Sequence, residues 1–182
     1  MKELWKKRQA LVEHALTEEL AKTPVLDDTL RASMEYSLMA GGKRLRPVLL
    51  MAAADAVGAD GTKFLPVACA LEMIHTYSLI HDDLPAMDND NLRRGKPTNH
   101  VKFSEGIAIL AGDALLTLAF TVILRQKDVP AEALLRVVDE ISRAAGAEGM
   151  VGGQVLDLAA ENRQITMEEL RRVHMGKTGA LF

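Results

Sequence analysis

The sequence predicts an all-α protein. Apolar residues recur at helical spacing almost throughout its 182 residues, and few stretches alternate as strands do. Ala, Leu and Met are frequent while aromatic residues make up only 4%, and straight-chain side chains lose little rotamer freedom in a helix. The length fits a single domain. Helices are expected over residues 3–22, 27–40, 47–57, 62–84, 105–126, 131–145, 148–160 and 167–182.

The boundaries of the first three helices are marked by proline and glycine. Pro24 follows the first helix. Gly41 and Gly42 end the second, because glycine adopts left-handed backbone angles without a steric penalty. Pro47 suits the first turn of the third, where a missing N–H costs no hydrogen bond.

Later boundaries are equally distinct. Residues 85–104 are polar and rich in proline and glycine, and they are expected to form one long loop. Thr166 and Glu169 have the spacing of a capping box before the last helix. Residues 179–182 continue a helical pattern without a cap, so we expect the chain to stop inside an element.

Composition excludes several classes of protein. A net charge of −3 argues against a general nucleic-acid binder. The single cysteine, Cys69, allows no intrachain disulfide. The N-terminus lacks the apolar stretch of a signal peptide, and the apolar region 107–124 contains Gly112–Asp113, which favours a buried helix over a membrane span. We therefore expect a cytoplasmic protein.

An acidic cluster is the most informative segment. Four acids fall within nine positions: Asp82, Asp83, Asp88 and Asp90. Mg²⁺ prefers carboxylate oxygens and often uses one or two carboxylates plus substrate phosphates. On a straight helix Asp88 would point about 120° away from Asp82, but Pro85 prevents that helix, so a bulge can return Asp88 toward Asp82. A solvated acidic turn is the alternative interpretation.

Two basic segments flank the acids in the sequence. Lys43 and Arg46 stand at the start of a predicted helix, whose N-terminus favours anions, and Gly42 permits close approach of a ligand to the backbone. Arginine binds phosphate through a planar fork and lysine through a point charge. Arg93 and Arg94 follow the acids directly. Each segment alone could be a basic surface turn.

His75 precedes Asp82 by seven residues, so the two side chains share a helix face roughly 10 Å apart. Ser78 lies on the same face, which indicates the wall of a wet cavity, although a lone helical histidine can be purely structural. A carboxylate patch for metals beside cations for phosphates predicts metal-assisted diphosphate chemistry.

These motifs resemble those of trans-prenyl diphosphate synthases, and most of all bacterial farnesyl diphosphate synthases. The family's Asp-Asp-x-x-x-x-Asp, Gly-Gly-Lys-x-x-Arg-Pro, Leu-Arg-Arg-Gly-x-Pro-Thr-Asn-His, Gly-Gln-x-x-Asp and Lys-Thr motifs are similar to residues 82–88, 41–47, 92–100, 153–157 and 177–178. The similarity extends over essentially the whole chain.

The resemblance implies an isoprenoid synthase helical bundle around a central cavity. In that family Mg²⁺ bridges the aspartates to an allylic diphosphate, whose ionisation gives an allylic cation. The double bond of isopentenyl diphosphate attacks this cation, and proton loss completes the condensation. Dimethylallyl or geranyl diphosphate would thus be extended to farnesyl diphosphate by an enzyme that is usually a homodimer.

The resemblance also implies residue roles. Isopentenyl diphosphate would be held by Gly42, Lys43, Arg46, His75 and Arg94. Asp82 and Asp88 would hold Mg²⁺, with Asp83 in support. The allylic diphosphate would face Arg93, Lys177 and Thr178. Gln154 and Asp157 would line the cavity near the metals, or be plain buried polar groups.

Product length is expected to depend on bulk just before the first aspartate. Tyr77 and Ser78 occupy the fifth and fourth positions before Asp82. Tyr77, together with the insertion that contains Pro85, resembles the farnesyl class. Ideal helix geometry, however, places Ser78 more squarely on the Asp82 face than Tyr77.

One family motif is absent from the sequence. No second Asp-Asp pair follows Asp83, whereas the family carries a second aspartate-rich motif after Lys-Thr. We therefore expect residues 1–182 to be the N-terminal portion of a single polyprenyl synthase domain, with little turnover alone. Alternatives are a geranylgeranyl diphosphate synthase, a terpene cyclase, which needs no second diphosphate pocket, and a non-catalytic helical subunit.

Overall fold

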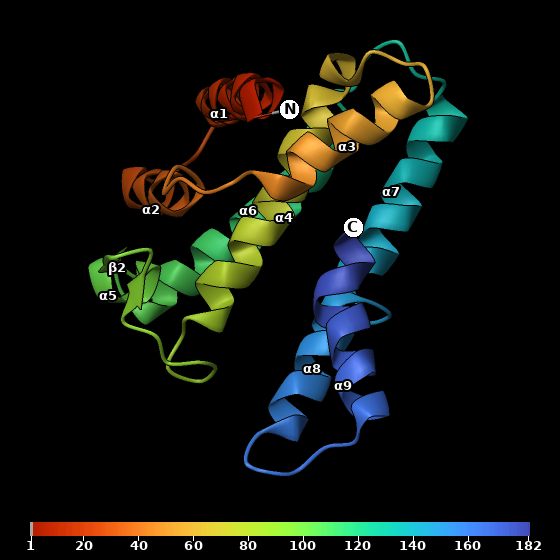
Figure 1. The fold of residues 1–182 in the computed structure, drawn as a ribbon. Coiled ribbons are helices and arrows are strands. Elements are labelled where there is room, and N and C mark those ends of the chain that lie inside the picture. The colour runs from red at the N-terminus through yellow and green to blue at the C-terminus, as the bar shows by residue number, and fades with distance from the viewer. Residues whose placement is uncertain (1) are drawn as a thin grey trace. The chain divides into compact units, whose positions relative to one another are not determined.

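The computed structural model describes residues 2–182, which form two compact units. The first unit ends at Gln126 and the second begins at Lys127. Nearly all regular structure in both units is helical, as the sequence predicts (Figure 1).

The first unit is built around two long helices that lie side by side (Figure 1). Its elements are α1 (Lys2–Lys22), α2 (Asp28–Leu38), α3 (Leu45–Ala56), a 3₁₀ turn (Gly61–Phe64), α4 (Leu65–Asp82), β1 (Leu92–Arg93), β2 (Lys96–Pro97), α5 (Asn99–Lys102) and α6 (Glu105–Ile123). Helices α4 and α6 supply most of the core, where small and branched side chains such as Ala68, Ile74, Ala111 and Leu115 are fully buried. Close packing of this kind dominates the stability of a helical domain.

Helix α4 is shorter than the predicted 62–84. Its first predicted residues lie in the 3₁₀ turn, and it ends at Asp82. The α region is disfavoured for the residue before a proline, so Leu84–Pro85 cannot continue the helix. The C-terminus of α4 therefore coincides with the first aspartates.

The prediction that residues 85–104 form one loop is wrong, because they contain the β1–β2 hairpin and α5. Arg94 and Gly95 connect the strands with φ angles of 54° and 76°. A tight two-residue hairpin turn requires such positive angles at both positions. Each strand is two residues long, so the sequence shows no alternation from which to predict it.

Helix α6 runs without interruption through Gly112–Asp113. Among residues 2–182 it alone is long and apolar enough to cross a bilayer by length and composition. Its packing along α4 buries Ala111, Leu115 and Ala119, as in the core helix of a globular protein. A Cβ on Gly112 would lie 2.2 Å from Nε2 of His81, so glycine at this position makes room for the imidazole.

The second unit contains α7 (Ala131–Ala145), α8 (Met150–Ala160) and α9 (Met167–Val173), followed by a π-helical turn (His174–Thr178) and a 3₁₀ turn (Gly179–Leu181). The predicted α-helix 167–182 thus keeps α geometry only to Val173. The predicted capping box is confirmed: the Thr166 hydroxyl accepts from the Glu169 N–H, and the Glu169 carboxylate accepts from the Thr166 N–H.

Backbone-to-backbone packing joins α8 to the π-helical turn. A Cβ on Gly153 would lie 2.0 Å from the backbone nitrogen of Lys177. Only glycine permits so close an approach. This contact brings Asp157 and Lys177, which are twenty positions apart, within ion-pair distance.

Candidate active site

Residues 41–44, hereafter the glycine loop, lead into α3 through left-handed backbone conformations. The φ angles are 83° at Gly41, 136° at Gly42 and 48° at Arg44. Glycine adopts such angles readily, whereas for arginine they cost roughly 1 kcal/mol. The side chain of Arg44 must therefore be held by compensating contacts.

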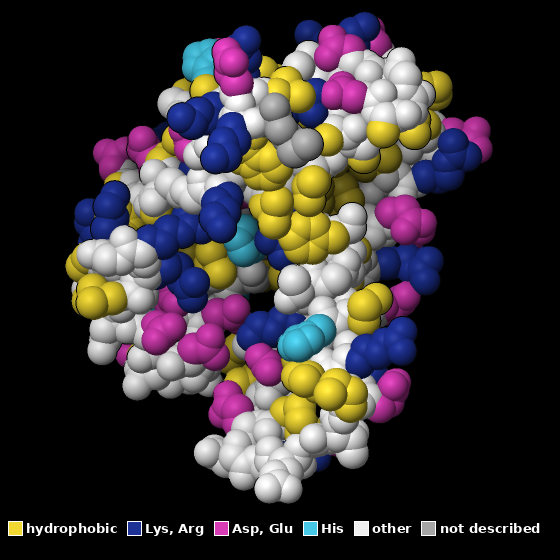
Figure 2. Space-filling view, in the orientation of Figure 1, with side chains coloured by type: hydrophobic (Ala, Val, Ile, Leu, Met, Phe, Trp, Pro, Cys, Tyr) yellow, Lys and Arg dark blue, Asp and Glu magenta, His cyan; other side chains and the backbone are white. Residues whose placement is uncertain are grey.

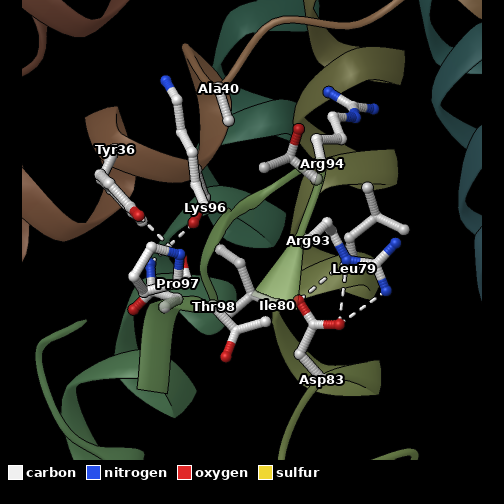
Figure 3. Close-up of a pocket in the computed structure, with 13 residues that line it drawn as sticks. Tyr36, Ala40, Leu79, Ile80, Asp83, Arg93, Arg94, Lys96, Pro97 and Thr98 are labelled. Carbon is white, nitrogen blue, oxygen red and sulfur yellow. Dashed lines mark hydrogen bonds and ion pairs between the residues drawn. The ribbon is translucent and has the colours of Figure 1, made fainter. Parts of the chain in front are cut away.

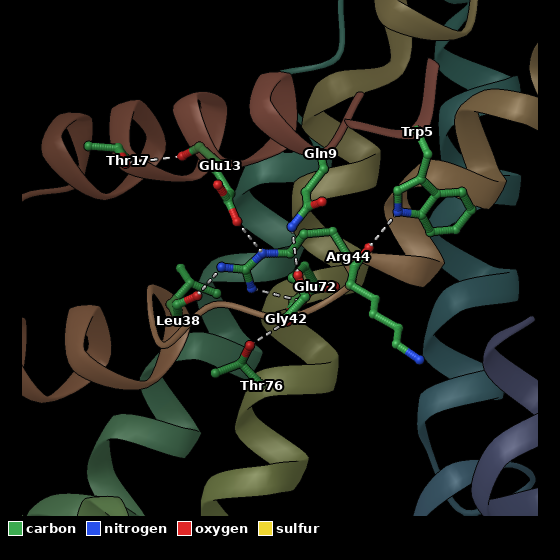
Figure 4. Close-up of polar contacts among 10 residues, drawn as sticks. Trp5, Gln9, Glu13, Thr17, Leu38, Gly42, Arg44, Glu72 and Thr76 are labelled. Carbon is green, nitrogen blue, oxygen red and sulfur yellow. Dashed lines mark hydrogen bonds and ion pairs between the residues drawn. The ribbon is translucent and has the colours of Figure 1, made fainter. Parts of the chain in front are cut away.

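Three elements hold Arg44, which is 3% exposed. Nη1 donates to the Glu72 carboxylate of α4 at 2.9 Å, and Nη2 donates to the Leu38 carbonyl of α2 at 2.9 Å. Nε lies 3.6 Å from the Glu13 carboxylate of α1. Figure 4 shows these groups converging on the guanidinium. Arg44 is thus an anchor that fixes the glycine loop on the helices.

The cations predicted for phosphate binding flank this anchor. Lys43 is exposed, and Arg46 is half-buried in the first turn of α3, which begins at Leu45. Burial lowers the pKa of Arg46, while the nearby Glu72 raises it. No side chain caps the N-terminus of α3, so its first-turn N–H groups do not have a side-chain acceptor there.

His75 marks where the two basic segments meet. Burial, together with the positive charges of Arg46, Arg94, Arg93 and Arg44, lowers its pKa to about 3. Coulomb effects weaken with distance, so arginines from the glycine loop, the first turn of α3 and the hairpin lie near enough to act on one imidazole. At neutral pH His75 is therefore uncharged and can donate one N–H.

Contact between the loop and the hairpin is direct. The Arg94 guanidinium lies against Gly42, where an added Cβ would be 2.6 Å from Nη1. Gly42 therefore serves both as a left-handed hinge and as space for Arg94. The structure thus brings together two of the predicted residues, Gly42 and Arg94.

Residues 82–90, hereafter the acidic turn, follow α4. The Asp88 N–H donates to the Asp82 carbonyl at 2.8 Å, and the Asn89 N–H donates to the Leu84 carbonyl at 3.1 Å. The chain thus bulges at Pro85 and returns, as expected from the sequence. Figure 2 shows Lys and Arg side chains gathered beside Asp and Glu side chains in the region of the hairpin and this turn.

Asp83 differs from its neighbours because it is 3% exposed and paired with Arg93. Nε of Arg93 donates to both carboxylate oxygens at 2.9 Å, and Nη2 donates to Oδ1 at 2.6 Å (Figure 3). The pair raises the pKa of Arg93. This ion pair holds the hairpin against the end of α4. Asp83 and Arg93, both predicted as site residues, therefore also contribute to the fold.

The donor set of the acidic turn fits Mg²⁺. Asp82 is half-buried and Asp88 is exposed. Among residues 2–182 no three His, Cys, Asp or Glu side chains form a ready-made metal site. Mg²⁺ commonly uses one or two carboxylates, waters and substrate phosphates rather than a complete protein cage. A pair of carboxylates at a surface turn matches that preference.

A pocket lies between α2, α4 and the hairpin (Figure 3). Its void, including the open mouth, measures about 420 Å³. Leu79, Ile80 and Tyr36 provide apolar lining, while Arg94 and Lys96 contribute positive charge. The pocket therefore combines an apolar wall with the cations of the hairpin.

The residues predicted to limit product length lie on α4. Tyr77 is 6% exposed, and its ring meets the His81 imidazole edge to face at 5.6 Å between centroids. Burial and Asp82 raise the pKa of its phenol. Ser78 is half-buried and donates to the His75 carbonyl at 2.8 Å. Tyr77 is thus a bulky buried group near the aspartates, whereas Ser78 is small and locally bonded.

The remaining predicted residues belong to the second unit. Lys177 Nζ donates to Asp157 Oδ2 at 2.6 Å. Gln154 is half-buried, and its Nε2 is buried without an acceptor in the described part of the chain. Thr178 is exposed. Lys177, Asp157 and Gln154 come together through the packing of α8 on the π-helical turn.

Sequence reasoning missed the groups that hold the glycine loop. Arg44 stands at an unspecified position of the 41–47 motif, whereas Glu72, Trp5 and Gln9 are distant from that motif in sequence and belong to none. Glu72 offered one signal, because it is the single acid within the otherwise apolar segment 65–80. A lone buried acid requires a cationic partner.

The chain is similar in sequence to known prenyl diphosphate synthases. The sequence is 58% identical over 159 residues to the farnesyl diphosphate synthase of Bacillus subtilis, covering 86% of this chain and 54% of the relative. It is 54% identical over 152 residues to a geranylgeranyl diphosphate synthase of Cyanophora paradoxa, covering 82% of this chain and 51% of the relative. The chain therefore spans about half the length of these relatives.

The structure agrees with the sequence comparison. A crystal structure of a geranyltransferase from Legionella pneumophila superposes with a TM-score of 0.95 at 42% identity, covering 99% of this chain and 64% of that one. The family described as polyprenyl synthetase matches residues 27–182. The chain belongs to the polyprenyl synthetase family.

Proposed function

We propose that the protein is a Mg²⁺-dependent prenyltransferase that condenses isopentenyl diphosphate with dimethylallyl or geranyl diphosphate to give farnesyl diphosphate. The observation that carries this proposal is that Arg94 lies against Gly42 while Arg93 pairs with Asp83, so the hairpin brings its cations to both the glycine loop and the turn of Asp82 and Asp88. Cations and carboxylates in one place suit a diphosphate and its metal.

The isopentenyl diphosphate would bind where the glycine loop meets the hairpin. Lys43, Arg46 and Arg94 supply positive charge to its phosphates. Neutral His75 donates an N–H, and Gly42 leaves room for the approach. Bound phosphate would raise the pKa of His75, because negative charge favours the protonated imidazole.

The allylic diphosphate would bind at the acidic turn. Asp82 and Asp88 would hold Mg²⁺, which when bound offsets the negative charge of the departing diphosphate. Asp83 keeps Arg93 in place beside that turn through the bidentate pair.

The chemistry would proceed in three bond changes. The allylic C–O bond breaks, and the diphosphate leaves with the electron pair. The double bond of isopentenyl diphosphate forms the new C–C bond, and the adjacent carbon then gives a proton to the released diphosphate while its C–H electrons form the new double bond. Buried bulky residues of α4 such as Tyr77 would exclude water from the cation.

The proposal also includes the domain organisation, the compartment and the oligomeric state of the protein. Residues 1–182 would be the N-terminal portion of a single polyprenyl synthase domain, in a cytoplasmic homodimer. The match to about half of each relative's length supports the domain assignment. A longer product is the second candidate, because one relative is a geranylgeranyl diphosphate synthase. The buried ring of Tyr77 favours the shorter, farnesyl product.

Calorimetric titration with isopentenyl diphosphate tests the proposal. Lys43→Ala should raise Kd about tenfold or more, because a charge-assisted hydrogen bond contributes roughly 1.5–3 kcal/mol. Lys63→Ala, at another exposed lysine of the first unit, is the matched control and should leave Kd unchanged. Equal affinity of the Lys43→Ala and unaltered proteins would refute the proposed site.

Product length tests the finer assignment. In an enzyme that comprises the whole domain, Tyr77→Ala should lengthen the product beyond C15, because removing the ring opens space near the aspartates. Tyr77→Phe, which keeps the bulk, is the control and should retain C15. Chromatography of products made from labelled isopentenyl diphosphate distinguishes the cases, and C15 from both variants would contradict the assignment.

A further inference from the structure

Helix α1 lies outside residues 27–182, the stretch that matches the family, yet it binds the backbone of the glycine loop. Nε1 of Trp5 donates to the Lys43 carbonyl at 3.2 Å. Nε2 of Gln9 donates to the Gly42 carbonyl at 2.8 Å. Two consecutive carbonyls of the loop are therefore held by one helix.

The contacts from α1 form a regular stripe. Trp5, Gln9 and Glu13 are spaced four residues apart, so their side chains lie on one helix face. Glu13 lies 3.6 Å from Nε of Arg44. Figure 4 shows all three residues directed at the same segment of the loop.

These contacts also orient the amide groups of the loop. All described peptide bonds are trans, and in a planar trans peptide the C=O and N–H point in opposite directions. When the Gly42 and Lys43 carbonyls face α1, the N–H groups of Lys43 and Arg44 face away from it. Successive N–H groups in a loop with left-handed residues favour anions.

We infer that Trp5 and Gln9 are positioning residues for diphosphate binding. They act through the loop backbone: by holding the carbonyls on either side of the Lys43 Cα they fix the residue that carries this lysine and turn the N–H groups of Lys43 and Arg44 away from α1. The inference rests on the proposed diphosphate role of Lys43. It extends that role to a helix that contributes no motif of its own.

Calorimetric titration with inorganic pyrophosphate and Mg²⁺ tests the inference on the 182-residue chain. Trp5→Phe keeps an aromatic ring but removes the N–H, and Gln9→Met keeps length but removes the amide. Each should raise Kd about three- to tenfold, the loss expected for one hydrogen bond. Gln126→Met is the matched control, because Gln126 also donates to a distant carbonyl, that of Lys63, at 3.0 Å.

Melting temperature separates positioning from a purely structural role. A structural role lowers the melting temperature without changing Kd at a temperature where the variant is folded. The double variant Trp5→Phe/Lys43→Ala adds a second readout. If Trp5 acts through the loop, its effect on Kd should shrink once Lys43 is gone, because coupled residues are not additive.

The outcomes distinguish this inference from the proposed function. If Lys43→Ala raises Kd while Trp5→Phe and Gln9→Met leave it unchanged, the positioning role is overturned and the diphosphate site stands. If Lys43→Ala leaves Kd unchanged, or the unaltered chain does not bind pyrophosphate, both are overturned. Should either single variant fail to fold, the other decides the question.

Discussion

The glycine loop and the acidic turn are both short connections beside α4, but they are held in different ways. The glycine loop is anchored by Arg44, which is 3% exposed and bonded to groups from three helices. In the acidic turn, backbone hydrogen bonds close the chain, and Asp88 is exposed. One connection is rigidly pre-formed, whereas the other leaves carboxylate oxygens for a ligand to complete.

The difference has a physical reason. Cations that recognise a diphosphate gain most when their geometry is fixed before binding. Mg²⁺ carries its own waters and gains ligands from the substrate, so its carboxylates need not be enclosed in advance. Asp83 is the exception within the acidic turn, because its bidentate pair with Arg93 makes it part of the scaffold.

Among the variants that test this comparison, Arg44→Met should lower the free energy of unfolding most. The change leaves the Glu72 carboxylate, which has a side chain only 4% exposed, as an uncompensated buried charge. Breaking a buried pair in this way costs about 3–5 kcal/mol. Guanidinium unfolding should show that loss, whereas Lys43→Met at the exposed neighbour should change stability by less than about 0.5 kcal/mol. Similar losses for both variants would show that the loop is not anchored through Arg44.

Asp83→Asn should affect mainly stability, whereas Asp88→Asn should affect mainly metal binding. Asp83→Asn removes the charge that holds Arg93 and should lower the free energy of unfolding by about 3 kcal/mol. Asp88→Asn should change it by less than about 0.5 kcal/mol while abolishing the effect of Mg²⁺ on pyrophosphate binding. Unfolding curves and calorimetry with and without Mg²⁺ measure both quantities. If the two variants are equally stable, Asp83 is not part of the scaffold and does not differ from Asp88 in this respect.

Gly42→Ala compared with Gly41→Ala probes the space for Arg94. Both glycines have positive φ, but only at Gly42 would a Cβ meet the Arg94 guanidinium. Gly42→Ala should therefore lower the free energy of unfolding by about 1–3 kcal/mol and weaken pyrophosphate binding. Gly41→Ala should show only the smaller backbone cost, roughly 1 kcal/mol. Indistinguishable affinities would remove Arg94 from the site.

A further effect should be an altered acid sensitivity in His75→Gln. The pKa of His75 in the folded protein is about 3, below its ordinary value of 6.5, so the unfolded chain binds the extra proton first. Its contribution to stability is complete above pH 6.5 and decreases as pH falls toward 3. The decrease reaches at most about 1.4 kcal/mol per pH unit.

Urea unfolding between pH 7 and pH 4 measures this contribution. The His75→Gln protein should lose less stability on acidification than the unaltered protein. His14→Gln, at an exposed histidine of α1, should follow the unaltered curve. Parallel curves for all three proteins would mean that His75 is not held neutral by the surrounding arginines.

Much of the molecule could be predicted from local sequence. Periodicity predicted the helices, and Pro85 predicted the bulge that closes Asp88 onto Asp82, because a proline cannot continue a helix. The hairpin could not be predicted, since its two-residue strands leave no alternation to read. The pair of Asp83 with Arg93 depends on that hairpin and was missed with it.

What the sequence by itself determined is therefore the chemistry: which residues carry charge, where helices begin and end, and the motifs shared with the polyprenyl synthetase family. What only the tertiary structure decided is the use of those charges. Arg44 and Arg46 belong to one motif, yet the first is an internal anchor because Glu72, Leu38 and Glu13 surround it. Burial and partners depend on distant segments, and local sequence does not encode which of those segments will meet.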